Sequence, residues 1–264
     1  MDARLRSPIA SAAARALGTR PRHLQRLRLE LADGAATTLH VATYDLRLTM
    51  PRVHRLAQPT PLERWCRAHR VNEAIVGGFF VRPGGMPLGE LRTSGIVRAT
   101  EPFEAPWDGV RACLHVSGNR IAIARRAALP AEPTGDLLQA GPLLVDDGRP
   151  CVDGDAEGFS AGQRQFDSDI TAGRYPRAAL ALTPNRRMLA VACDGRADDE
   201  AGLTLAELAE ALTALGAHVA LNLDGGGSTS LVCGGRLRNT PREEHGIVLS
   251  GGRPVSTVIA FTPR

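Results

Sequence analysis

The sequence contains no lysine, so all 32 of its basic residues are arginine. These arginines are scattered along the chain, the net charge is only +4, and aromatic residues make up 4% of the sequence. Nucleic-acid-binding surfaces combine a basic stripe with aromatic side chains on which bases stack. We therefore expect no nucleic-acid partner.

Cysteine is also scarce, with five residues that are odd in number, widely spaced and without a Cys-x-x-Cys pair. Disulfide frameworks and zinc clusters both need even or closely spaced sets. The seven histidines form no His-Glu-x-x-His pattern, which further disfavours a zinc centre. The thiols are expected to be small buried groups in a reducing compartment.

Long apolar runs are absent as well. No stretch approaches the length of a transmembrane helix, and residues 1–28 contain no apolar segment of the kind that a signal peptide needs. These absences predict a cytoplasmic location and no membrane partner.

The chain nevertheless has the material for a substantial core, because 43% of its 264 residues are apolar. Alternating and short apolar runs predict many strands and few helices, in one mixed, strand-rich α+β domain with the helices packed on the sheet. Within this single domain over 1–264, residues 1–69 form an N-terminal hairpin and helix extension and 70–264 form the core. The strands are expected at 24–31, 37–48, 73–81, 110–116, 120–125, 143–145, 178–183, 188–193, 218–223, 228–233 and 254–261.

Three helices are expected, at 7–17, 61–70 and 205–215. The last has the strongest signals, since its leucines and alanines recur on one face. Thr204 and Glu207 have the spacing of a capping box, and Gly216 supplies a stop.

The most informative motif is Asp224-Gly225-Gly226-Gly227-Ser228, directly after an apolar strand. Glycine loses more backbone entropy on folding than any other residue, so three in a row indicate close approach of the backbone to a ligand. Their amides would suit an anion, and Asp224 and Ser228 add a carboxylate and a hydroxyl. The alternative is a glycine-rich turn capped by an aspartate.

Two further motifs follow or precede strands. Asp194-Gly195-Arg196 ends one strand, and Arg177 begins another. A guanidinium at a strand end can hold a phosphate or carboxylate through two hydrogen bonds. The alternatives are an ordinary Asp-Gly turn for the first motif and a solvated arginine for the second.

The segment 152–174 is rich in acids and poor in apolar periodicity. Asp167 and Asp169 would point the same way in an extended chain, which suits a metal ion or an acid–base pair, with Glu157 as a further acid. A solvated acidic loop is the alternative. Gly78, inside an apolar strand, and Gln139, beside a turn, are candidate ligand contacts or ordinary core residues.

These motifs, taken in order, resemble the phosphodiester glycosidase family. Any one of them is weak, but seven in the family's order are specific. The matching segments are 74–80, 139–145, 176–179, 194–196, 202–208, 223–228 and 253–256.

The resemblance implies hydrolysis of a glycosyl phosphodiester, a sugar-1-phosphate diester, carried by a small molecule or an oligosaccharide. Arg177, Arg196 and the amides of Gly225, Gly226 and Gly227 would bind the phosphodiester, with Ser228, Gly78 and Gln139 also contacting substrate. Asp224 or Asp194 would stabilise the anomeric centre or activate water. Reserve acids or Ca²⁺ ligands are Glu157, Asp167 and Asp169.

No cofactor is expected to be required, and Ca²⁺ is the ion that the acidic segment would take. Two other functions stay open at this point. One is an exo-glycosidase without preference for phosphate, and the other is a non-catalytic module that binds carbohydrate or polyanion. No oligomeric state follows from the sequence.

Overall fold

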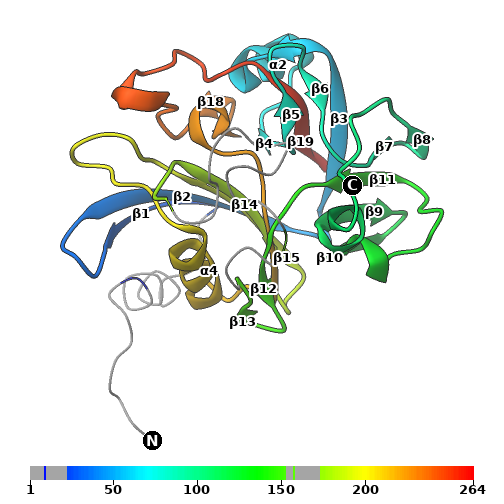
Figure 1. Cartoon of the computed structure of the whole chain (residues 1–264), viewed down its shortest axis with the longest axis horizontal. Helices are drawn as coiled ribbons and strands as arrows, with labels where there is room; N and C mark the ends of the chain where they lie inside the picture. Colours follow the sequence, from blue (N-terminus) through cyan, green and yellow to red (C-terminus); the bar gives the residue numbers. More distant parts are fainter. Residues whose placement is uncertain (1–8, 10–22, 153–156, 158–172) are drawn as a thin grey trace, which may run out of the picture.

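A computed structural model describes residue 9 and residues 23–152, 157 and 173–264. The protein is built mainly of antiparallel β-strands arranged in three larger sheets and one small hairpin (Figure 1). The strand-rich part of the predicted fold is therefore confirmed. The predicted mixed α+β class overstates the helices, because the structure is mostly β and its named helices are short.

A seven-stranded sheet forms the centre of the molecule. Its strands in spatial order are β1 (Leu24–Glu30), β2 (Ala36–Asp45), β15 (Arg187–Cys193), β14 (Arg177–Leu182), β16 (Val219–Asn222), β12 (Leu143–Asp146) and β13 (Arg149–Pro150). The predicted hairpin across Asp33-Gly34 is confirmed, with Leu24 opposite Ala42 and Glu30 opposite Ala36.

A five-stranded sheet packs beside it. It is ordered β18 (Arg236–Leu237), β17 (Leu231–Cys233), β4 (Ala74–Val76), β19 (Val255–Pro263) and β3 (Thr49–Thr60). The sequence analysis missed β3, which contains Pro51 and Pro59 among charged residues. Proline is tolerated there because β3 is the edge strand of its sheet. The strand expected at 228–233 begins only at Leu231, since Gly226–Ser228 forms a 3₁₀ turn.

The remaining elements are shorter. A second five-stranded sheet is ordered β10 (Arg120–Arg125), β9 (Ala112–Ser117), β11 (Asp136–Gln139), β7 (Leu91–Thr93) and β8 (Ile96–Val97), and the hairpin consists of β5 (Phe80–Val81) and β6 (Met86–Pro87). The helices are α2 (Leu62–His69), α3 (Trp107–Val110) and α4 (Leu205–Ala214), with 3₁₀ turns at Arg126–Ala128 and Glu244–Gly246. The helix predicted at 7–17 lies outside the described residues apart from Ile9.

Both faces of the seven-stranded sheet are buried. Successive side chains of a strand point to opposite faces, so alternate residues enter different cores. Ala179 and Ala181 of β14 pack with Leu208 and Leu212 of α4, whereas Leu180 packs toward the β19–β4 sheet. Figure 1 shows α4 on one side of this sheet and β4 and β19 on the other.

Helix α4 begins as the sequence predicts. Thr204 accepts a hydrogen bond from the Glu207 amide, and the Glu207 side chain accepts one from the Thr204 amide, which completes the capping box. The helix therefore enters the core at a fixed angle.

Residues 23–69 are integrated into the fold. Strand β2 lies between β1 and β15, and β3 pairs with β19 along most of its length. Within the described residues, no helix combines the length and apolar character needed to cross a membrane.

Candidate active site

Three of the predicted motifs meet at the ends of three neighbouring strands of the central sheet, β15, β14 and β16. Strand β14 runs antiparallel to both β15 and β16, with Arg177 opposite Cys193 and Ala179 opposite Asn222. The start of β14 therefore lies beside the ends of its two neighbours. This topology brings Arg177, Asp194 and the loop that follows Asn222 together.

The loop Asp224–Ser228, called the glycine loop below, needs each of its glycines for a different reason. A Cβ on Gly225 would lie 2.9 Å from the Pro176 carbonyl oxygen, and Gly226 has a φ of +59°. A Cβ on Gly227 would lie 2.8 Å from Oε1 of Glu243. The loop thus packs closely against both the β14 entrance and a carboxylate.

Four of the loop amides are engaged within the protein. The Gly226 N–H donates to the Pro176 carbonyl at 2.8 Å, and the Gly225 N–H donates to the Asp224 carboxylate. The N–H groups of Asp224 and Ser228 donate to the carbonyls of Gly77 and Gly225, each at 3.1 Å. These four amides hold the loop in shape, so charge recognition falls mainly to side chains around it.

Asp224 is the half-buried carboxylate at the start of the loop. Burial raises its pKa from 3.8 to about 6, and this rise is opposed by a hydrogen bond from Ser228 and by the charge of Arg253. Its amide is anchored on the Gly77 carbonyl at 3.1 Å. Near neutral pH this carboxylate is poised to exchange a proton, the property that general acid–base catalysis requires.

A second carboxylate, Glu243, lies against the same loop and was not singled out from the sequence. Arg253 donates to both of its oxygens, from Nε to Oε1 at 2.7 Å and from Nη2 to Oε2 at 2.5 Å. The hydrogen bonds from Arg253 hold the pKa of Glu243 below its usual value. Arg253 Nη1 also lies 3.4 Å from the Ser228 hydroxyl.

Arg196 lies across the glycine loop, as its strand-end position suggests. Its Nη1 lies 3.7 Å from Oε2 of Glu243 and donates to the Arg242 carbonyl at 3.3 Å. The same nitrogen would lie 3.4 Å from a Cβ added to Gly226. The exposed Arg82 adds a third positive charge, which lowers the pKa of both Asp224 and Glu243. The loop is therefore surrounded by cations.

Sheet pairing brings Asp194 and Arg177 beside this site, but their side chains are engaged in the scaffold. Asp194 is buried, with Oδ2 2.8 Å from His40 Nε2 and Oδ1 accepting from the Thr240 amide at 2.7 Å. Arg177 is also buried, and its Nε and Nη2 donate to the carbonyls of Leu203 and Gly173 at 2.8 and 2.7 Å. These contacts fix the strand ends that carry the glycine loop.

The other predicted site residues lie around β11, β12 and β4. Buried Glu157 accepts from the Leu143 amide at 3.0 Å and from Arg125 at 2.9 Å, and burial raises its pKa. Gln139 donates to the Asp108 carbonyl and accepts from the Glu90 amide.

The Gly78 amide donates to the Thr257 hydroxyl, one residue after the Gly77 carbonyl that holds Asp224. Asp167 and Asp169 lie outside the described residues.

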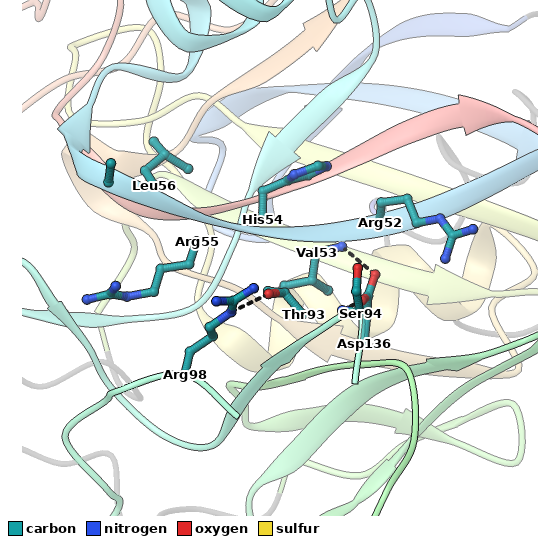
Figure 2. A pocket seen from close by; sticks show the side chains of 10 residues that line it. Arg52, Val53, His54, Arg55, Leu56, Thr93, Ser94, Arg98 and Asp136 are labelled. Carbon is teal, nitrogen blue, oxygen red and sulfur yellow. Dashed lines mark hydrogen bonds between the residues drawn. The ribbon is translucent and has the colours of Figure 1, made fainter. Parts of the chain in front are cut away.

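A cavity of about 610 Å³ lies elsewhere, between β3 and the β7–β11 strands, and it contains none of the glycine-loop residues (Figure 2). Arg52, Arg55 and Arg98 line it together with Asp136. The Asp136 carboxylate there accepts from the amides of Val53 and Ser94. Because that carboxylate is committed to the backbone, we place the candidate site at the glycine loop.

Comparison with known proteins gives a consistent result. The family model described as phosphodiester glycosidase matches residues 69–262. The catalytic domain of zebrafish N-acetylglucosamine-1-phosphodiester α-N-acetylglucosaminidase, in a form auto-inhibited by its pro-peptide, has a similar fold. It superposes with a TM-score of 0.67 at 18% identity, covering 93% of this chain and 85% of that one.

A hypothetical protein from Synechocystis is similar as well, with a TM-score of 0.64 and 21% identity. The match covers 91% of this chain but 62% of the Synechocystis protein, so the chain spans less than two thirds of that length. No curated protein matches the sequence.

Proposed function

The chain belongs to the phosphodiester glycosidase family, and from that premise we propose that it hydrolyses a sugar-1-phosphate diester at the glycine loop. One observation carries the proposal. Asp224 begins the glycine loop and Glu243 lies against it, and the surroundings of these two carboxylates move their pKa values in opposite directions. Such a separation is typical of active sites in which two acids have different roles.

Asp224 is the group that would act on a proton. Above a pH of about 6 it is largely ionised and can accept a proton from a water molecule that attacks the anomeric carbon. Asp194, the alternative carboxylate, already uses both oxygens on His40 and Thr240. It would act as a positioning residue.

The arginines would supply the charge complementarity. As the new bond from water oxygen to the anomeric carbon forms, the bond to the phosphate oxygen breaks and the phosphate monoester leaves as an anion. A phosphate leaving group is stable as an anion and needs less protonation than a sugar alkoxide. Arg196 and Arg82 would neutralise it, while Arg253 is held by Glu243.

The test compares two probes. A benzyl phosphodiester of N-acetylglucosamine 1-phosphate is the first substrate to try, since the zebrafish enzyme is named for that sugar linkage. The second probe is the nitrophenyl glycoside of the same sugar. We expect hydrolysis of the phosphodiester and little of the glycoside.

Other results would contradict the proposal. Equal hydrolysis of both probes would favour an exo-glycosidase without preference for phosphate. Stoichiometric binding without product would favour a binding module. Full turnover by both Asp224→Asn and Arg196→Ala would remove the glycine loop as the catalytic site.

A further inference from the structure

Three side chains that are distant in the sequence meet at the end of β4 opposite Gly77. His23 precedes β1, Glu73 precedes β4, and Cys233 ends β17. One ligand atom from each lies within 4.8 Å of the other two. We propose that His23, Glu73 and Cys233 bind a zinc ion.

The spacing of these atoms is close to that of a zinc centre. Zinc is bound tetrahedrally at roughly 2.0–2.3 Å, which places neighbouring ligand atoms roughly 3.3–3.8 Å apart. His23 Nε2 lies 3.1 Å from Oε2 of Glu73, slightly closer than this range, and all three ligand atoms lie within 4.8 Å of one another, so small side-chain shifts would bring them to zinc-binding distances. With three protein ligands, a water molecule would complete the tetrahedron on the exposed side of His23.

The hydrogen bonding of His23 directs its Nε2 toward Glu73. Its Nδ1 lies 3.2 Å from the Thr43 carbonyl oxygen, and because a carbonyl can only accept, Nδ1 must carry the hydrogen. In neutral imidazole the lone pair is then on Nε2, which faces the carboxylate oxygen of Glu73. A cation bound between the Nε2 lone pair and the Glu73 oxygen would use both groups as ligands.

The surroundings also resemble the outer shell of a metal site. Zinc-binding histidines usually donate their other ring hydrogen to a carbonyl or carboxylate, as His23 does to Thr43. Glu73 is oriented by the Tyr44 hydroxyl at 2.9 Å and by the Gly234 amide at 2.8 Å. The Tyr44 hydroxyl donates to Oε2, the oxygen that faces His23, and the Gly234 amide donates to Oε1, so the carboxylate is held in position.

Cys233 determines which ion fits. A thiolate sulfur favours zinc over magnesium or calcium, which prefer oxygen. Binding would convert the thiol to a zinc-bound thiolate and release its proton to solvent. One thiolate, one carboxylate and Zn²⁺ give a neutral site, which suits the buried position of the Cys233 sulfur.

This site differs from what the sequence predicts. The spacing of the cysteines and histidines in the sequence argued against a zinc site. Short motifs such as Cys-x-x-Cys reveal only ligands that are close in the chain. Here the ligands come from two sheets. A bound ion would link His23, next to the seven-stranded sheet, to the β17–β4 sheet.

Cobalt titration of the metal-free, reduced full chain is the direct test. Co²⁺ replaces zinc and reports a sulfur ligand through a thiolate-to-cobalt charge-transfer band. We expect this band to saturate at one equivalent and to disappear when Zn²⁺ is added. Cys233→Ser should abolish it, His23→Gln should weaken Co²⁺ and Zn²⁺ binding more than about tenfold, and Cys151→Ser should leave both unchanged.

Two results would overturn the proposal. One is no charge-transfer band in the wild-type chain at one equivalent of Co²⁺, which would leave His23 and Glu73 as a simple ion pair. The other is an undiminished band in Cys233→Ser. Calorimetric titration of the wild-type chain with Zn²⁺ gives an answer that does not depend on the variants folding.

Discussion

Arg253 donates to both carboxylate oxygens of Glu243, and Arg196 lies 3.7 Å from the second of them. This arrangement neutralises Glu243 and places its carboxylate directly against Gly227. Paired hydrogen bonds of this kind fix both side chains in one geometry. The Arg253–Glu243 pair therefore packs against the glycine loop as a rigid, charged group.

Glu243→Gln should lower kcat/KM for the sugar-1-phosphate diester by at least about tenfold, because the amide carries no charge and offers Arg253 one acceptor oxygen in place of two. Steady-state kinetics measure the effect. The neighbouring Glu244 is exposed, so Glu244→Gln is the matched control and should keep full activity. Equal losses in both variants would argue against a specific role for Glu243.

Asp224→Asn should reduce kcat by about 100-fold or more, the range expected for loss of a general base. In the wild-type enzyme kcat/KM should rise with pH through about 6, as the raised pKa of Asp224 is passed. The pH dependence of single-turnover rates measures this. The exposed Asp198 supplies the control, and Asp198→Asn should retain the wild-type profile.

The stability of Asp224→Asn separates a catalytic role from a structural one. Folding raises the pKa of Asp224, so the folded state holds the proton more tightly than the unfolded state. This group's contribution to stability therefore falls as the pH rises from about 4 toward 6. Asn should remove that fall and leave Tm at pH 8 equal to or above the wild-type value. A lower Tm would indicate that the carboxylate holds the loop together.

Gly227→Ala should abolish most activity. Its Cβ would lie 2.8 Å from Oε1 of Glu243 and 3.1 Å from Nη2 of Arg253, so the ion pair must move. Turnover of the phosphodiester probe measures the loss, expected to be at least about tenfold since small misplacements of catalytic groups are costly. An added Cβ at Gly109 meets nothing within 4 Å, so Gly109→Ala should leave turnover unchanged.

Arg177 and Arg196 should respond differently to removal. Arg177→Ala leaves the buried carbonyls of Leu203 and Gly173 without these donors and should lower the free energy of unfolding by about 1–3 kcal/mol or more. Arg196→Ala should leave Tm close to wild type but reduce kcat/KM. Chemical denaturation and kinetics on both variants measure the contrast, and the reverse pattern would assign Arg177 to substrate.

The Thr204 cap offers a prediction about stability alone. Thr204→Ala removes the acceptor for the Glu207 amide and should cost about 1 kcal/mol of folding free energy. Urea denaturation measures it. Thr213 lies inside the same helix, and its hydroxyl donates back to the Ala209 carbonyl. Thr213→Ala should therefore change stability by much less, since such back-bonding adds little to a helix.

The parts of the site that could be predicted from the sequence are those with a local signal. Three glycines after an apolar strand mark a loop, and short apolar runs mark β14, β15 and β16. The turn at 184–186 joins β14 to β15, whereas the pairing of β16 with β14 follows helix α4 and has no local signal. Glu243 has no such signal, because it lies in a polar, irregular segment and acquires its role only from Arg253. The same holds for His23 and Cys233, which only the packing of two sheets brings together.

The direction in which each side chain points also could not be predicted from the sequence. Arg177 and Asp194 lie at strand ends, where the sequence places them, but they point into the scaffold and satisfy buried backbone groups. Residue type and position cannot distinguish a charge that faces a ligand from one that faces a carbonyl. Strand β3 was missed for a related reason, since its prolines obscure a strand that lies at a sheet edge.

The pairing of β3 with β19 has a consequence for synthesis. Met50 and Thr262 are paired although they are 212 residues apart, so β3 must wait for nearly the whole chain to leave the ribosome before it finds its partner. Until then β3 and β4 present open edges that are prone to association with other chains. Arg253 lies two residues before β19, so docking of this strand also brings Arg253 and its partner Glu243 against the glycine loop. The glycine loop should therefore reach its final form only after β19 has paired with β3.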